Sequence, residues 1–184
     1  MCHSPAVQNL IRPIDSRSQP APPDAALRID QRSLHLIDVE NLMGSPAFES
    51  ECVAELRARY NAVAIVGPRD LVVVASSHFA AVATWFGWPG ARRLARSGVN
   101  GADMALIDVI ENEGLADRFT RVVVASGDGI FANPCSELQR LGCTITVVAR
   151  ADAVSRRLAL AVRDIRYLGP HVHGAPSFAL REVG

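Results

Sequence analysis

The sequence predicts an α/β fold in which a mainly parallel sheet is covered by helices on both faces. Short Val-rich runs alternate with helical patterns through the body of the chain, as in consecutive βαβ units. The clearest run, 121–125, leads into Ser126-Gly-Asp-Gly129, where the glycines indicate a sharp turn. Open α/β sheets bind ligands at the carboxyl ends of their strands, so Asp128 stands where a site is expected.

Strand and helix alternate through the first half of the predicted domain. Strands are predicted at 34–37, 71–75 and, as a short piece, 91–96, and helices at 46–60 and 78–86. Ser45 is a favourable N-cap for the first helix, because Pro46 suits the first helical position. Gly87-Trp-Pro-Gly90 ends the second helix.

The same alternation continues in the second half. Strands are predicted at 121–125, 143–149 and 165–168, and helices at 101–119, from Pro134 to Gly142, and at 154–161. Asn100 and Asn133 are the expected N-caps of the first two helices. Residues 1–32, rich in Pro, are predicted to be a flexible leader, 33–168 to be the domain, and 169–184 to be a loose tail.

Composition restricts the classes of function. The chain has 184 residues, 49% of them hydrophobic, which suits one globular domain. Its formal net charge is zero, so no overall basic field attracts a polyanion. All 19 basic residues are Arg, which excludes lysine Schiff-base chemistry and a Walker-type phosphate lysine.

The sequence also predicts a soluble, cytoplasmic protein. Its 4 cysteines form no CxxC pair and have no zinc-ligand spacing, which favours reduced thiols. The N-terminus lacks the pattern of a signal peptide. No uninterrupted apolar run reaches the ~18 residues that a membrane span needs, so no membrane partner is expected.

Three carboxylates are expected at one edge of the sheet. Asp38 comes directly after the first strand and Asp128 after the fourth, and these strands can be central neighbours. Asp103 lies in the first turn of the helix after Asn100, above the same edge. Three such groups would repel one another unless a cation neutralised them. Mg²⁺ takes oxygen ligands and keeps several waters, which fits this sparse cluster.

Each carboxylate also has an ordinary structural alternative. Asp38 and Asp128 could close turns by accepting backbone N–H groups. Asp103, three residues after Asn100, could belong to a capping box. The joint metal-site hypothesis is favoured because three ordinary roles would otherwise coincide at one edge.

Two further acidic residues are weaker candidates. Asp108 lies five positions after Asp103, about 140° away around a helix, so a solvated position is favoured. Glu40 is predicted to face away from Asp38 if the strand geometry continues past the first strand.

Several polar residues could contact a substrate at this edge. Those at strand ends could hold a phosphate or orient a water, or could simply cap helices and close turns: Asn41, Ser76 and Ser126. The densest basic group before Asp103 could contact a phosphate backbone or form a solvated edge: Arg92, Arg93 and Arg96.

Three motifs in the right order resemble the NYN family of PIN-like nucleases. They are Asp38-Val-Glu-Asn41, Gly101-Ala-Asp103-Met-Ala-Leu106 and Val124-Ala-Ser-Gly-Asp128-Gly-Ile-Phe131. The resemblance covers about residues 34 to 149. It implies a Rossmann-like, three-layer α/β/α sandwich with a ribonuclease site that depends on Mg²⁺ or Mn²⁺.

The resemblance also implies roles for single residues. Asp38, Asp103 and Asp128 match the catalytic, metal-binding carboxylates, and Asn41 and Ser126 match polar positions of the family motifs. Many relatives carry a further Asp where this chain has Ile130. That difference removes a possible ligand for a second metal.

The leading hypothesis is a metal-dependent ribonuclease, an endonuclease that hydrolyses phosphodiester bonds of single-stranded RNA. The alternative is a catalytically weak or inactive PIN-like module that binds RNA or protein, which Ile130 and the neutral net charge favour. A phosphotransfer or phosphatase domain fits poorly, because the chain has no Lys and no DxD after the first strand. A homodimer is left open.

Overall fold

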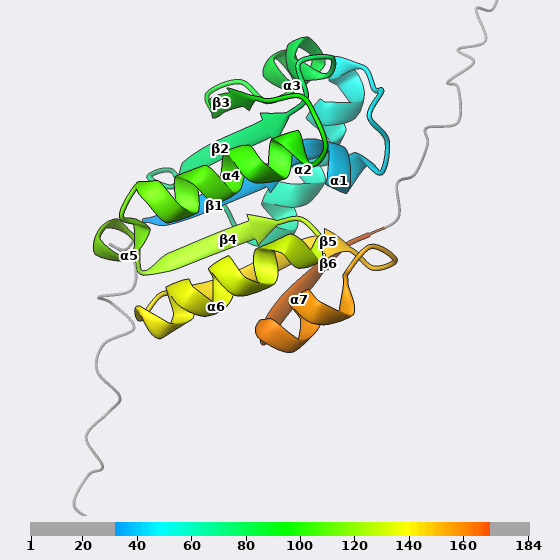
Figure 1. Ribbon diagram of the computed structural model, residues 1–184. Coiled ribbons are helices and arrows are strands. Elements are labelled where there is room, and N and C mark those ends of the chain that lie inside the picture. The colour runs from blue at the N-terminus through cyan, green and yellow to red at the C-terminus, as the bar shows by residue number, and fades with distance from the viewer. Residues whose placement is uncertain (1–31, 170–184) are drawn as a thin grey trace, which may run out of the picture. The chain divides into compact units, whose positions relative to one another are not determined.

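Six parallel strands form one sheet at the centre of the protein (Figure 1). The computed structural model describes residues 32–169. The predicted leader and tail, apart from Arg32 and Gly169, lie outside this range. The strands are β1 (Ser33–Asp38), β2 (Leu71–Ser76), β3 (Arg92–Ala95), β4 (Arg121–Ala125), β5 (Thr144–Arg150) and β6 (Asp164–Leu168). Their order in the sheet is β3-β2-β1-β4-β5-β6.

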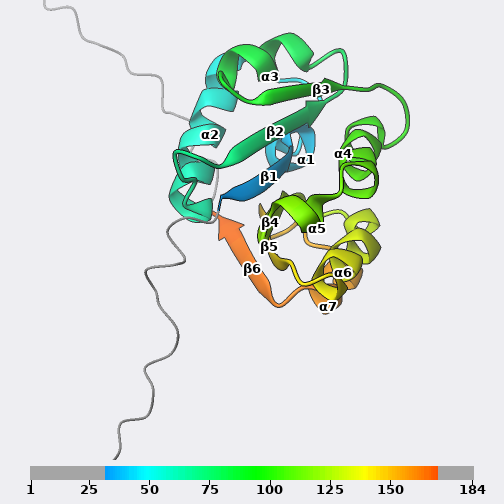
Figure 2. The same cartoon turned by 90° about the vertical axis from the view of Figure 1, so that its left-hand side faces the viewer.

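Helices cover both faces of this sheet. They are α1 (Val39–Met43), α2 (Ser50–Ala64), α3 (Ala81–Gly87), α4 (Gly101–Asn112), α5 (Leu115–Arg118), α6 (Ala132–Arg140) and α7 (Arg156–Ala161), with a 3₁₀ turn at Gly129–Phe131. In Figure 2, α2 and α3 lie on one side of the strands and α4, α6 and α7 on the other. The predicted Rossmann-like α/β/α sandwich is therefore confirmed. No helix within residues 32–169 is long and apolar enough to cross a membrane.

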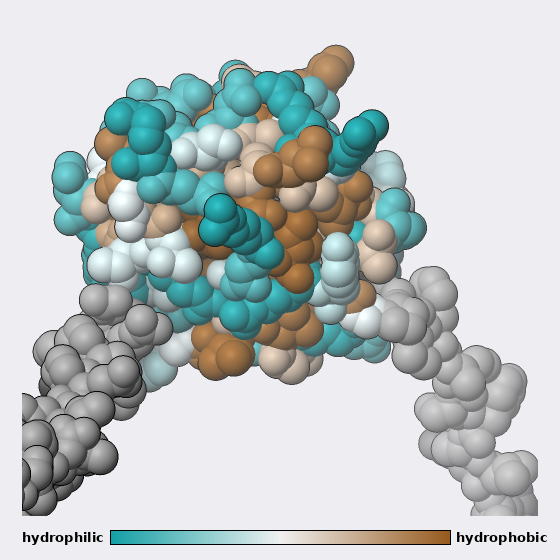
Figure 3. All heavy atoms as spheres, turned by 90° about the horizontal axis from the view of Figure 1, so that it is seen from below, coloured by the Kyte–Doolittle hydropathy of each residue, from teal (hydrophilic) through white to brown (hydrophobic). Residues whose placement is uncertain are grey.

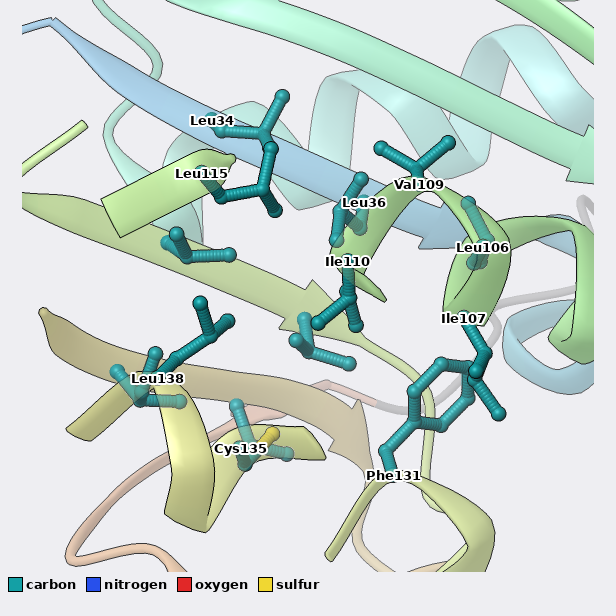
Figure 4. Close-up of a cluster of buried hydrophobic side chains, with 14 of the residues drawn as sticks. Leu34, Leu36, Leu106, Ile107, Val109, Ile110, Leu115, Phe131, Cys135 and Leu138 are labelled. Atoms are coloured by element: carbon teal, nitrogen blue, oxygen red, sulfur yellow. The ribbon is translucent and has the colours of Figure 1, made fainter. Parts of the chain in front are cut away.

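Alternation along β1 supplies both layers of the core. Leu34 and Leu36 belong to the cluster that joins the sheet to α4, α5 and α6 (Figure 4). Ile37 belongs to the second cluster, which contains Leu56 of α2. Because successive strand residues point to opposite faces, Asp38 continues the row of Leu34 and Leu36 on the α4 side.

The register of the strands brings the ends of β1, β2 and β4 together. Asp38 lies opposite Ala75 of β2, and Ile37 lies opposite Ala125 of β4. The expected pairing of the first and fourth strands is therefore confirmed. Turns that follow these strands leave the sheet at the same edge, which is the condition that the predicted site needs.

The helices depart from prediction mainly at their ends. The sequence predicts that the helix after Gly44 starts at Pro46, but Ser45 and Ala47 hydrogen-bond to each other, and α2 begins only at Ser50. The helix predicted over 101–119 is divided, because Gly114 has a left-handed backbone (φ 57°) between α4 and α5.

The predicted helix cap at Asn133 is also wrong. Asp128 caps the 3₁₀ turn that precedes α6, and α6 continues directly from that turn at Ala132. The predicted strands at 71–75, 91–96, 121–125, 143–149 and 165–168 all overlap observed ones. The Val-rich runs of β2, β4 and β5 are largely buried, which is why these strands could be found in the sequence.

A buried polar network lies at the beginning of β1, far from the strand ends that carry the carboxylates. The His35 ring is fully buried between the hydroxyl of Tyr60, 2.7 Å from Nδ1, and the carboxylate of Asp70, 3.2 Å from Nε2. Nε2 donates to Asp70, and Nδ1 accepts from Tyr60, so the neutral imidazole satisfies both partners. Burial lowers the pKa of His35, although Asp70 opposes this shift.

This network predicts how stability depends on pH. Below about pH 6.5 the unfolded chain protonates His35 and the folded protein resists, so the contribution of His35 to the free energy of unfolding falls by up to about 1.4 kcal/mol per pH unit. Other titrating groups are common to the wild type and His35→Gln, so in urea unfolding the wild type should lose stability relative to His35→Gln between about pH 7.5 and about pH 5.5. A difference between the two proteins that is the same at both pH values would contradict the assignment.

Candidate functional site

Asp38 is the junction between β1 and α1. It is the last residue of the strand and the N-cap of the helix, where its Oδ1 accepts from the backbone N–H of Asn41 at 3.1 Å. The side chain is only 4% exposed. Asp38 therefore does close the turn after β1, the ordinary role that the sequence left open as an alternative. It also has a second contact, on the α4 side of the sheet.

That second contact is with Asp103, in the first turn of α4. The two carboxyl groups lie within hydrogen-bonding reach of each other, and the negative charge of Asp103 acts on Asp38. Burial, followed by this charge and the hydrogen bond, raises the pKa of Asp38 to about 8. A hydrogen bond between two carboxyl groups requires a proton between them, so the pair carries less than its full negative charge.

Asp103 is held at this place by the approach of α4 to β3. Gly101 starts the helix so close to the strand end that a Cβ there would lie 2.2 Å from the carbonyl oxygen of Arg96. The capping-box alternative is wrong, because Asn100 has a left-handed backbone and its side chain makes no cap hydrogen bond. Oδ1 of Asp103 is buried and has no hydrogen-bond partner among the described residues.

Asp128 reaches the same edge from β4. Its Oδ1 accepts from the N–H of Ile130 at 2.9 Å, so it also closes its own turn. Its charge raises the pKa of Asp103, after the larger effect of burial. Ile130 packs against the core beside α4 and offers no ligand.

Asn41 and Ser126 shape the two turns that carry the carboxylates. Oδ1 of Asn41 accepts from the N–H of Gly127 at 2.9 Å and so ties the β1 turn to the β4 turn. The fully buried hydroxyl of Ser126 accepts from the N–H of Asp128 at 3.2 Å. Both predicted residues are therefore at the site, where their observed contacts position backbone.

Glu40 is a site residue that the sequence prediction missed. The prediction that Glu40 faces away from Asp38 is wrong, because strand alternation places residues two apart on the same face, and the chain in any case becomes helical at Val39. Its charge acts on both Asp38 and Asp103, and its Oε1 accepts from the backbone N–H of Ser77 at 3.1 Å and from the hydroxyl of Ser77. Asp38 itself was the available signal, because Asp is a favoured N-cap and could have indicated a helix that begins at Val39.

Ser76 ends β2 at the same edge but points to the other layer. Val74, two residues earlier, packs in the α2 cluster, and alternation gives Ser76 the same face. Its hydroxyl is buried and has no partner among the described residues. The structure thus separates Ser76 from the carboxylates, which lie on the α4 side.

The three predicted basic residues each have an intramolecular partner. Arg92 pairs with Glu113 at 2.7 Å, and Arg96 pairs with Asp108 at 2.8 Å. Arg93 lies over the ring of Trp85, 5.7 Å from its centroid. Asp108, predicted to be solvated, is therefore half-exposed and ion-paired.

The site is a close pair of carboxyl groups, Asp38 and Asp103, whose pKa values are also raised by the charge of Glu40 and, for Asp103, by that of Asp128. Within residues 32–169, no three or more Asp, Glu, His or Cys side chains converge closely enough to hold a metal ion as they stand. The chemistry of the donors nevertheless suits a hard divalent cation, since all four are carboxylates and Oδ1 of Asp103 lacks a partner.

Comparison with known proteins supports the fold only. No protein-family model matches the sequence, and no curated protein matches it either. One similar solved structure is a protein of unknown function from Vibrio parahaemolyticus, with a TM-score of 0.50 and 12% identity, over 76% of this chain and 94% of that chain. At 12% identity this likeness concerns the fold alone.

The buried pair predicts that Asp38→Asn stabilises the metal-free protein. Between about pH 4 and about pH 8 the folded wild type must take up a proton that the unfolded Asp38 lacks, so its stability falls as pH rises. Asp38→Asn lacks this titration. Its free energy of unfolding relative to the wild type should therefore rise with pH by up to about 1.4 kcal/mol per unit, measured by urea unfolding in the presence of a chelator.

Asp117→Asn is the matched control, because Asp117 is an exposed carboxylate on α5, at the opposite edge of the sheet. Its free energy of unfolding relative to wild type should not change over this pH range. An advantage of Asp38→Asn that stays constant with pH would show that the pair does not hold a proton.

Proposed function

We propose that this protein is a metal-dependent ribonuclease that hydrolyses phosphodiester bonds of RNA, as an endonuclease on single strands. The observation that carries the proposal is the meeting of Asp38 and Asp103 at the carboxyl edge of the sheet, with Oδ1 of Asp103 buried and unpartnered. The resemblance of the surrounding motifs to the NYN family of PIN-like nucleases supports it. A cytoplasmic location belongs to the same proposal.

Asp38 and Asp103 would hold Mg²⁺ or Mn²⁺, with Asp128 as the third carboxylate. When bound, the cation supplies charge that activates water and stabilises the phosphoryl oxygens. Binding requires the carboxyl pair to release its proton, so affinity should rise with pH. Glu40 adds negative charge beside the pair and is itself held by Ser77.

The rest of the site keeps these groups in place. Asn41 fixes the turn after β1 to the turn after β4, and Ser126 holds the N–H of Asp128. Removing either side chain would leave the carboxylates present but less well oriented. Their role is therefore to position the carboxylates. Variants that lack either side chain should lose activity although every carboxylate is still present.

A second candidate is a PIN-like module that binds RNA or protein without cleaving it. Two features favour it: no ready three-ligand cluster exists among residues 32–169, and Ile130 packs in the core at a position where many members of the resembled NYN family carry an acid. Binding of a divalent cation discriminates between the candidates, because the module has no need of one.

Purified protein is expected to cleave a single-stranded RNA oligonucleotide in Mg²⁺ or Mn²⁺ and to stop when the metal is chelated. Asp38→Asn, Asp103→Asn and Asp128→Asn should each lower kcat about 100-fold or more, because each removes a negative charge that would hold the cation. Asp117→Asn should leave kcat unchanged. Cleavage that survives in all three site variants would refute the assignment.

A further inference from the structure

An RNA strand needs a positive group beside this negatively charged site. Four carboxylates, Asp38, Glu40, Asp103 and Asp128, surround the edge of β1, and the whole chain is electrically neutral. Phosphate groups would be repelled there unless an arginine lay close by with its charge uncompensated. The arginines near the edge can therefore be sorted by what already binds them.

Most arginines on the β3 and β5 sides are already neutralised by carboxylates, and Arg93 of β3 is held instead over the Trp85 ring, where it donates to the carbonyl oxygen of Trp85. Arg92 and Arg96 pair with Glu113 and Asp108, at the β3 side of the site. Arg150, the last residue of β5, pairs with Asp152 at 2.7 Å. To bind a phosphate, each of these ion-paired guanidinium groups would have to exchange a carboxylate for it, which gives little net gain.

Arg157, the second residue of α7, is different. Its guanidinium donates to Oδ1 of Asn133 at 2.9 Å, and no carboxylate within residues 32–169 pairs with it. Asn133 lies in the first turn of α6, which follows the Asp128 turn directly. A neutral amide thus orients the guanidinium and leaves its charge available.

The start of α7 also packs directly against the Asp128 turn. The N–H of Ser155 donates to the carbonyl oxygen of Gly127 at 2.8 Å. A Cβ on Gly129 would lie 2.9 Å from the hydroxyl oxygen of Ser155 and 3.6 Å from Cβ of Arg157. Arg157 is therefore anchored beside the residues on either side of Asp128.

We propose that Arg157 binds a phosphate of the RNA strand, and that the strand crosses the side of the site formed by α6 and α7. This inference depends on the proposed function. It assigns the main phosphate contact to Arg157, where the sequence had suggested the arginines of β3. Figure 3 views the molecule from this side, where hydrophilic side chains lie among exposed apolar ones. The planar guanidinium suits two phosphate oxygens at once.

The test compares Arg157→Gln with Arg156→Gln, a neighbouring exposed arginine of α7, and with Arg92→Gln on the β3 side. The probe is a fluorescein-labelled oligouridine, which is single-stranded. Arg157→Gln should raise KM about 10-fold and change kcat less than about two-fold, because the contact serves binding. The slope of log Kd against the logarithm of the salt concentration should fall by about one, the value for one phosphate contact, in Arg157→Gln and not in the two control variants.

Binding is also measured in metal-free buffer, which separates this inference from the proposed function. If the wild type binds the oligouridine but does not cleave it, the ribonuclease proposal fails and weaker binding by Arg157→Gln still supports the inference. If Arg157→Gln matches the wild type in KM, Kd and salt slope, the inference is overturned. Arg157→Lys should restore part of the affinity, and equal thermal unfolding of all variants excludes a structural cause.

Discussion

The contact between Asp38 and Asp103 is the interaction on which the interpretation of this protein depends. It exists because β1 lies at the centre of the sheet and α4 begins directly above its carboxyl end. A buried carboxyl pair is unfavourable in an unliganded fold, since charge must be suppressed by a shared proton. Such an arrangement is hard to explain by stability alone, and it is common where a protein binds a cation.

Close backbone approaches stabilise this arrangement. Gly101 lets α4 begin against the carbonyl of Arg96, and Gly127 lets the β4 turn lie against the loop before α7, where a Cβ would meet the carbonyl oxygen of Ala153 at 2.2 Å. Asn41 then joins the β1 turn to the β4 turn. The carboxylates are therefore held by the packing of three loops, more than by contacts between the carboxylates themselves.

Much of the fold could be predicted because the signals are local. Val-rich runs marked the buried strands, and the residues directly after β1 and β4 marked the edge where Asp38 and Asp128 meet. Helix ends were less predictable: Ser45 and Asn133 have good capping side chains, but neighbouring turns begin α2 and α6 elsewhere.

Contacts between distant segments could not be predicted. Glu40 joins the site in the first turn of α1, where its carboxylate meets Ser77 at the start of the segment after β2, a contact between parts of the chain 37 residues apart. No pattern in the sequence tells which arginine finds a carboxylate and which finds an amide, so Arg92 and Arg157 look alike there. The tertiary structure distinguishes them, because it pairs Arg92 with Glu113 and packs α7, with Arg157, on the Asp128 turn.

The most direct measurement of the central claim is the anomalous difference density of crystals soaked in Mn²⁺ at a pH above the pKa of Asp38. The metal-site account predicts a peak between the carboxylates of Asp38 and Asp103 that is absent in Asp103→Asn crystals. Crystals of the wild type with no peak there, under conditions in which Mn²⁺ occupies other sites, would contradict it.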